Sequence, residues 1–255
     1  MYTSDIELIS KMSQKKAKAA KDNLGKYMGR GIVTGFFVML AIILSYTTGA
    51  MLYPKYPEVA KVIIAATFCF AIAQVVFFSG ELFTGNNFVM CVGLFKKKVS
   101  IGETLKIWLL SFIGNGIGLI ILGYIFIKSG ASLSIIQHYI ETVAHAKLEL
   151  TPLQMVLRGI LCNFSVCLAY LGGMKMKTES GKLAMIFFAV FAFIIAGFEH
   201  SIANIGIFTL AQFSSGALPM ALVFKNLFFV VIGNIIGGGL LLGGALTYIS
   251  VDEVK

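Results

Sequence analysis

Residues 61–95 read KVIIAATFCFAIAQVVFFSGELFTGNNFVMCVGLF, an apolar run with one polar interruption around Gly80, Glu81 and Gly85. A helix needs about 20 apolar residues to cross a bilayer core of roughly 30 Å, so this run is too long for one straight span. Backbone that leaves the helix at membrane depth has unpaired amides unless protein buries it or a polar cavity receives it. The run therefore predicts a membrane helix that is broken beside a polar path.

A second apolar run, residues 183–208, also has one polar interruption. Its polar break runs from Glu199 to Asn204, and the spacing of five residues from glutamate to asparagine recurs at Glu81 and Asn86. Four unbroken stretches complete six predicted spans, at about residues 31–52, 103–127, 150–173 and 223–249. The sequence thus predicts an all-α integral membrane protein in which spans two and five are interrupted.

The composition supports a lipid environment. Hydrophobic residues make up 58% of the chain and charged residues 13%, which is outside the usual balance of a soluble domain. The 27 glycines against four prolines are typical of closely packed membrane helices. The four cysteines fall in apolar segments without paired metal spacing, so we expect neither a metal site nor a cofactor: Cys69, Cys91, Cys162 and Cys167.

The basic residues behind the formal net charge of +9 are distributed unequally between the two predicted sides of the membrane. If the six spans alternate in direction, fifteen basic residues, Lys255 among them, fall on the side of the N-terminus and five on the other. The positive-inside rule then places both termini in the cytoplasm of a multi-pass protein. The same location of the charge argues against a nucleic-acid partner and for the lipid bilayer.

Two domains are predicted from this layout. Residues 1–29 are expected to form an amphipathic helix on the cytoplasmic surface, with a solvated basic arm as the alternative. Residues 30–255 are expected to form the six-helix channel domain, with repeats at about residues 30–127 and 150–249.

The two halves of the channel domain share three motifs in the same order, at offsets of 128, 118 and 119 residues. These are Arg30-Gly31-Ile32 with Arg158-Gly159-Ile160, Glu81 and Asn86 with Glu199 and Asn204, and Gly114-Asn115 with Gly233-Asn234. Because each half has three spans, the second half must enter the membrane from the opposite side. The result is an inverted repeat, and such repeats place the substrate path at their interface.

Glu81 and Glu199 lie in the two breaks. We expect them to be structural, accepting hydrogen bonds from the exposed amides of the restarted half-helices. Direct contact with the permeant is the alternative.

Three longer runs of residues stand out: Glu81-Leu82-Phe83-Thr84-Gly85, the Lys147 stretch leading into Arg158-Gly159-Ile160-Leu161-Cys162-Asn163, and Phe198-Glu199-His200-Ser201-Ile202-Ala203-Asn204. Together they closely resemble the formate/nitrite transporter family, and the resemblance covers essentially the whole chain. The resemblance implies a homopentamer of aquaporin-like protomers in the bacterial cytoplasmic membrane. Each protomer would have its own pore for small monovalent anions or their conjugate acids.

The resemblance also assigns positions in the pore. It implies that His200 lies near mid-membrane beside Thr84, with Asn163 and Asn204 in the same central site. Two apolar constrictions are implied, Leu82 and Phe83 on the cytoplasmic side and Phe68 and Phe193 on the periplasmic side.

The sequence Thr84-Gly85-Asn86-Asn87 is most similar to the hydrosulfide channel branch of the family. Hydrosulfide is therefore the favoured permeant. Formate and nitrite carriers share nearly all of the pore residues, so both anions stay open as alternatives.

The chemistry of the permeation path follows from its residues. An anion in an apolar constriction loses its hydration, so charge must be offset or neutralised nearby. His200 and Thr84 can donate hydrogen bonds, and His200 can also titrate near neutral pH. Lys147 is expected to attract anions at the periplasmic mouth. The alternatives are a structural His200 satisfied by backbone, Asn163 or Asn204, and a Lys147 that only snorkels to the interface.

Three other functions compete with an anion channel. A water or glycerol channel normally carries paired Asn-Pro-Ala motifs, and none of Pro54, Pro57, Pro152 and Pro219 follows an asparagine. An enzyme is not expected, because His200 has no helical His or Cys partner for metal or nucleophilic chemistry. A proton-coupled formate or nitrite transporter is the closest alternative, since a titratable histidine serves symport as well as passive conduction.

Overall fold

The computed structural model describes residues 2–216 and 218–251, and their regular structure is helical apart from one bridge between Tyr2 and Val251. The first half comprises α1 (Thr3–Asp22), α2 (Leu24–Leu52), α3 (Pro57–Phe77), α4 (Phe83–Phe95) and α5 (Ile101–Ser129). The second comprises α6 (Leu133–Leu148), α7 (Pro152–Lys175), α8 (Glu179–Ile195), α9 (Ser201–Ser215) and α10 (Met220–Asn234), which continues through a π-helix (Ile235–Gly244) into α11 (Ala245–Tyr248). Lys255 and the end of the predicted channel domain lie outside the described residues.

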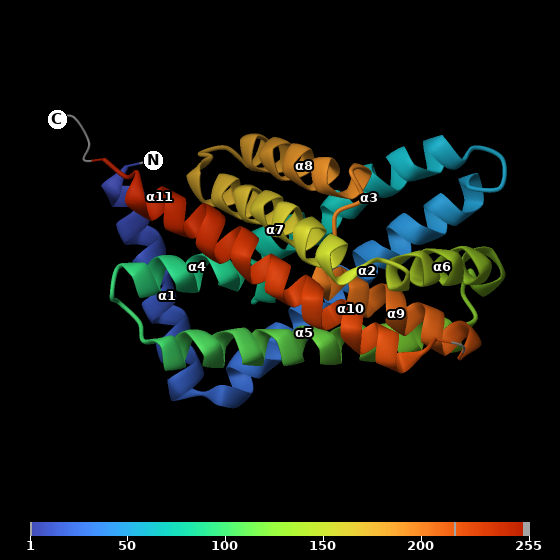
Figure 1. The fold of residues 1–255 in the computed structure, drawn as a ribbon, viewed down its shortest axis with the longest axis horizontal. Coiled ribbons are helices and arrows are strands. Elements are labelled where there is room, and N and C mark those ends of the chain that lie inside the picture. Colours follow the sequence, from blue (N-terminus) through green and yellow to red (C-terminus); the bar gives the residue numbers. More distant parts are fainter. Residues whose placement is uncertain (1, 217, 252–255) are drawn as a thin grey trace.

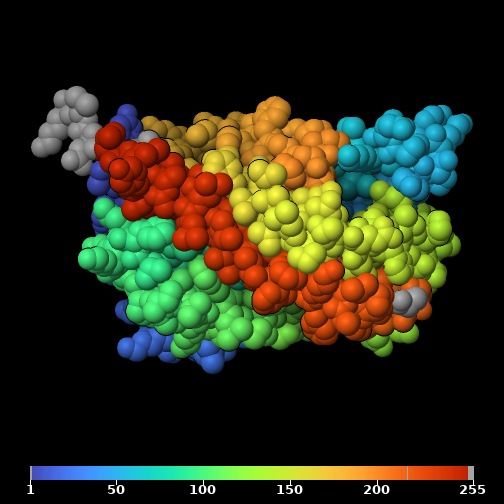
Figure 2. Space-filling view, in the orientation of Figure 1, coloured from blue at the N-terminus to red at the C-terminus, as the bar shows by residue number. Residues whose placement is uncertain are grey.

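The described part of the chain has five helices that are long and apolar enough to cross a membrane. These are α2, α3, α5, α7 and the continuous helix Met220–Tyr248, which runs diagonally across the face shown in Figure 2. The helices α8 and α9 have 17 and 15 residues, so each is too short to count as a membrane-spanning helix on its own. The prediction of an all-helical membrane protein is confirmed, while the count of six spans stays a prediction.

Both predicted interruptions are present. The first separates α3 from α4 at residues 78–82, and the second separates α8 from α9 at residues 196–200. The second residue of each is left-handed, Ser79 at φ 53° and Gly197 at φ 73°. The second break was expected to extend to Asn204 and instead ends at His200, because the His200 ring caps α9 by accepting a hydrogen bond from the Ala203 amide.

The order of elements repeats. In each half a short helix precedes a long helix, then a broken helix pair, then a second long helix. The paired long helices cross closely where the glycines of the shared motifs face each other. A Cβ placed on Gly159 would lie 3.1 Å from the Cα of Gly233, and one on Gly31 would lie 3.3 Å from the Cα of Gly114. The motifs therefore specify close helix packing.

Helix α1 packs across the end of the bundle where both termini lie (Figure 1). Its buried face includes Ile6, Ile9, Ser13 and Lys16, so it is not a solvated arm. Lys175 donates to Asp5 at 2.6 Å and lowers the pKa of that carboxyl. The contact is thus kept at neutral pH and is lost in acid, as the pH falls through the lowered pKa.

We expect Gly93→Ala to detach α1. A Cβ on Gly93 would overlap the Ser13 side chain, so one of the two helices must move. The measurement is the rate of tryptic cleavage at the lysines of α1, which should rise several-fold. Gly29→Ala is the matched control, because a Cβ there meets nothing within 4 Å and the gain in helix propensity of about 1 kcal/mol is the same. Equal cleavage rates in the two variants would show that this contact does not hold α1.

Candidate functional site

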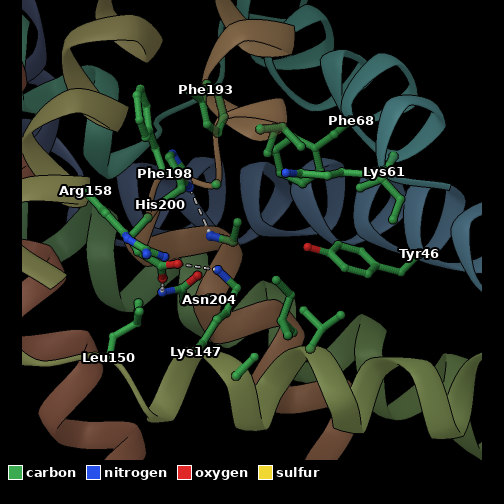
Figure 3. Close-up of a pocket in the computed structure, with 18 of the residues that line it drawn as sticks. Tyr46, Lys61, Phe68, Lys147, Leu150, Arg158, Phe193, Phe198, His200 and Asn204 are labelled. Carbon is green, nitrogen blue, oxygen red and sulfur yellow. Dashed lines mark hydrogen bonds and ion pairs between the residues drawn. The ribbon is translucent and has the colours of Figure 1, made fainter. Parts of the chain in front are cut away.

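Two cavities lie at the two breaks, and each contains the glutamate of its break. The α6-side vestibule has a volume of about 390 Å³ and contains Glu199, with Phe68, Phe193 and His200 in its lining (Figure 3). The α1-side vestibule has a volume of about 350 Å³ and contains Glu81. The short helix at the start of each half thus lines one vestibule, α1 in the first half and α6 in the second.

The first break is held by Asn115 of α5. Its side-chain amide donates to the carbonyls of Gly31 and Glu81, both at 2.9 Å, and its oxygen accepts from the Phe83 amide at 3.0 Å. One buried side chain therefore satisfies backbone groups within the break and at the start of α4, and ties both to α2. Carboxamides suit this position because they donate and accept at once.

The second break repeats the arrangement with Asn234. Its amide donates to the carbonyls of Gly159 and Glu199 at 2.9 and 3.0 Å, and its oxygen accepts from the Ser201 amide at 2.9 Å. The motifs Gly114-Asn115 and Gly233-Asn234 are thus the devices that make an interrupted helix tolerable in an apolar environment.

The expectation that the glutamates cap the restarted helices is wrong for Glu81. Its carboxylate is 1% exposed and accepts from Lys16 at 2.6 Å and from the Tyr27 hydroxyl at 2.9 Å, while Arg30 lies at 3.2 Å. The Asn86 amide completes the set at 3.3 Å. A buried carboxylate needs cationic and hydroxyl donors to offset its desolvation, and Asn115 already serves the backbone.

Glu199 has the corresponding surroundings. Its Oε1 accepts from Lys147 at 2.9 Å and its Oε2 accepts from Asn204 at 2.6 Å, in place of the expected backbone amides. The side chain of Glu199 is 3% exposed and that of Lys147 is 16% exposed. The lysine predicted to attract anions is therefore one partner of a largely buried ion pair.

Thr84, near the start of α4, and His200, the last residue of the second break, meet as the resemblance implied. The Thr84 hydroxyl lies 2.9 Å from His200 Nε2, and His200 Nδ1 accepts from the Ala203 amide at 3.0 Å. Because Nδ1 is an acceptor, the hydrogen of a neutral His200 must be on Nε2, where it points to the Thr84 oxygen. The hydroxyl hydrogen of Thr84 is then free to donate elsewhere.

The two predicted asparagines have different places. Asn163 is fully buried and donates to the carbonyls of Thr84 at 3.2 Å and Asn234 at 2.7 Å, so it ties the start of α4 to the end of α10. Asn204 lines the α6-side vestibule and binds Glu199 and Asn226. His200 is satisfied by Ala203 and Thr84 rather than by either asparagine.

The two pairs of apolar residues also differ. Phe68 and Phe193 meet edge to face with centroids 6.3 Å apart, and Phe193 stacks on the His200 ring at 6.0 Å. Leu82 and Phe83 are buried at the first break, but neither lines a described vestibule, and Phe83 packs on Phe112 at 5.2 Å. The structure thus brings together only the first pair at a vestibule.

Sequence reasoning missed part of the α6-side vestibule. Its lining also includes Tyr46, Lys61 and Arg158 (Figure 3). A signal for Lys61 was present, because it precedes Phe68 by seven residues and so shares a helix face with it. Tyr46 carries no comparable signal in the sequence.

Comparisons with known proteins agree with one another. A family model described as Formate/nitrite transporter matches residues 6–248. The uncharacterized transporter YwcJ of Bacillus subtilis is 30% identical over 99% of this chain and 100% of its own length. The nitrite transporter NirC of Escherichia coli is 31% identical over 95% of this chain and 90% of its own length.

Solved structures give the same result. A structure titled "FNT family ion channel" superimposes with a TM-score of 0.92 at 29% identity, covering 98% of this chain and 100% of that one. A structure titled "Pentameric formate channel with formate bound" has a TM-score of 0.76 at 24% identity, covering 91% and 98%, and shows likeness of fold.

Proposed function

Because this chain belongs to the formate/nitrite transporter family, we propose that it passes small monovalent anions, or their conjugate acids, through a pore between its two helix breaks. The observation that supports this most is the Thr84–His200 contact, which lies where the two breaks meet. The family is one of transporters and channels, so transport rather than catalysis is its function.

The charges of both vestibules favour anions. Lys61, Lys147 and Arg158 line the α6-side vestibule with one carboxylate, Glu199. The α1-side vestibule likewise contains three basic side chains, Lys15, Lys16 and Arg30, and one carboxylate, Glu81. Each mouth thus has two positive charges in excess, which raises the local concentration of anions and repels cations.

For the membrane arrangement we propose six spans in two inverted repeats. Helices α3 with α4 and α8 with α9 would each form one interrupted span, with α1 and both termini in the cytoplasm of a bacterial cell. Assembly as a homopentamer is supported by the solved structure titled as a pentameric formate channel.

At the centre, the permeant must pass Phe68 and Phe193, which offer no replacement for its hydration. The free hydrogen of the Thr84 hydroxyl can donate to a monoanion there, polarised by the His200 Nε2 hydrogen bond that its oxygen accepts. One donor does not offset the desolvation of a dianion, so monovalent charge is selected together with small size.

The identity of the permeant belongs to this proposal as well. Nitrite and formate appear in the descriptions of the relatives, and hydrosulfide is favoured by the residues from Thr84 to Asn87. A proton-coupled formate or nitrite transporter is the alternative mechanism, because the same histidine could carry a proton.

The experiment is a flux assay with purified protein in liposomes. Formate, nitrite and hydrosulfide are supplied separately, with and without a pH gradient. The proposal expects flux of at least one anion and no flux of sulfate. Flux that needs the gradient would select the proton-coupled mechanism, and absence of flux for all three anions would refute the proposed function.

A further inference from the structure

The two breaks differ in how their arginines are used. Arg30 lies 3.2 Å from Glu81 and donates to the Ser79 carbonyl at 2.9 Å. Arg158 occupies the equivalent position in the second half, 128 residues later. Yet no acidic side chain of the described residues pairs with it. The α6-side vestibule therefore contains a guanidinium group that makes no ion pair with a described acidic side chain.

The neighbouring glutamate explains why Arg158 stays free. Each oxygen of Glu199 already has a partner within 3 Å, Lys147 on Oε1 and Asn204 on Oε2. In the first half Glu81 pairs with Arg30, but its counterpart Glu199 is already bound by Lys147 and Asn204. Arg158 lines the same cavity as Lys147 and Asn204, and Figure 3 shows the three side chains near one another.

A second unpaired cation faces the same cavity. Lys61 lies on α3 seven residues before Phe68, which is about 10 Å along a helix on nearly the same face. Within the described ranges 2–216 and 218–251 it makes no ion pair. The amino group of Lys61 and the guanidinium group of Arg158 approach the cavity from different walls (Figure 3).

We propose that Arg158 and Lys61 form an anion-binding site in the α6-side vestibule that prefers planar monoanions with two oxygen acceptors, such as formate and nitrite, over hydrosulfide. A guanidinium group presents two parallel N–H donors, which match two oxygens on one central atom. Hydrosulfide has a single acceptor atom and cannot use the fork. Lys61 contributes charge without this geometry. The inference rests on the proposed function, and at this vestibule it selects formate or nitrite rather than the hydrosulfide that the residues from Thr84 to Asn87 favour.

The test compares Arg158→Lys with the native protein in the flux assay. The substitution keeps the positive charge and removes the fork, so the apparent KM for formate and nitrite should rise about tenfold, the equivalent of one lost charge-assisted hydrogen bond. The apparent KM for hydrosulfide should change less than twofold. Lys61→Gln should instead raise the apparent KM of all three anions by similar factors.

Arg30→Lys is the matched control, because that arginine is already paired with Glu81 and should leave the ratio of the three KM values unchanged. Equal changes for all anions in Arg158→Lys would overturn the proposal, as would no change. A native protein that conducts none of the anions would instead refute the proposed function.

A second measurement avoids any change at Arg158. The sequence has two arginines, Arg30 and Arg158, so phenylglyoxal modification of each can be followed by mass spectrometry of the native protein. Formate and nitrite should slow the modification of Arg158 at least several-fold more than chloride at the same concentration, with no such difference at Arg30. Equal protection by chloride would contradict recognition by the fork.

Discussion

Asn234→Leu is expected to disrupt the second break and abolish transport. The substitution removes three hydrogen bonds at once. The Gly159 carbonyl keeps its place in the helical ladder of α7, but the Glu199 carbonyl and the Ser201 amide lose the side chain that satisfies them. Each buried polar group left unsatisfied costs about 1–3 kcal/mol. For two such groups the loss is about 2–6 kcal/mol, a large share of the stability of a typical domain, about 5–15 kcal/mol. Thermal unfolding of the protein in detergent and anion flux in liposomes measure the effect.

The chain offers a matched control in Asn87→Leu. Asn87 is as buried as Asn234, but neither polar atom of its side chain has a hydrogen-bond partner among the described residues. Its replacement leaves no backbone group unsatisfied, so we expect unfolding within a few degrees of the native protein. Native-like unfolding and flux in Asn234→Leu itself would show that the asparagine does not hold the break.

Lys147→Met should be strongly destabilising, whereas the double variant with Glu199→Gln should recover most of the loss. Removing one partner of a buried ion pair costs about 3–5 kcal/mol, because the other charge stays buried and unpaired. The pair here joins Lys147 to a carboxylate that is 3% exposed. Unfolding temperatures of the two single variants and the double variant give the coupling between the residues.

The same variants decide between two roles for Lys147. If it mainly attracts anions, the double variant should show reduced flux at low salt even when it is stable. If it mainly pairs with Glu199, flux should recover with stability. We expect recovery, since Lys61 and Arg158 remain in the vestibule.

Much of the architecture could be predicted because it depends on local patterns. The interruptions at Glu81 and Glu199 were visible as polar residues within apolar runs, and the repeated Gly-Asn pair indicated that the two halves are related. The meeting of Thr84 and His200 came from family resemblance, since residues so far apart in sequence have no local signal for contact.

The partners of the charged groups could not be predicted for a related reason. Lys16 and Lys147 look like ordinary flanking lysines in sequence, and only the packing of α1 and α6 over the breaks brings them to Glu81 and Glu199. Asn115 and Asn234 likewise bind backbone groups of other helices. Which of several donors satisfies a buried acceptor depends on tertiary geometry, so Arg158 could be recognised as unpaired only in the structure.

The most direct test of the central claim is anion flux through His200→Phe in liposomes. Phenylalanine keeps the ring but removes the Nε2 hydrogen bond to Thr84 and the Nδ1 cap of α9. If the permeant crosses at this contact, flux of formate, nitrite and hydrosulfide should all fall at least tenfold, while thermal unfolding shows that the protein remains folded. The Thr84 hydroxyl loses the His200 Nε2 hydrogen bond that polarises it and directs its hydrogen to the anion, and a charge-assisted hydrogen bond is worth about 1.5–3 kcal/mol. Undiminished flux of all three anions through a folded His200→Phe protein would contradict the account.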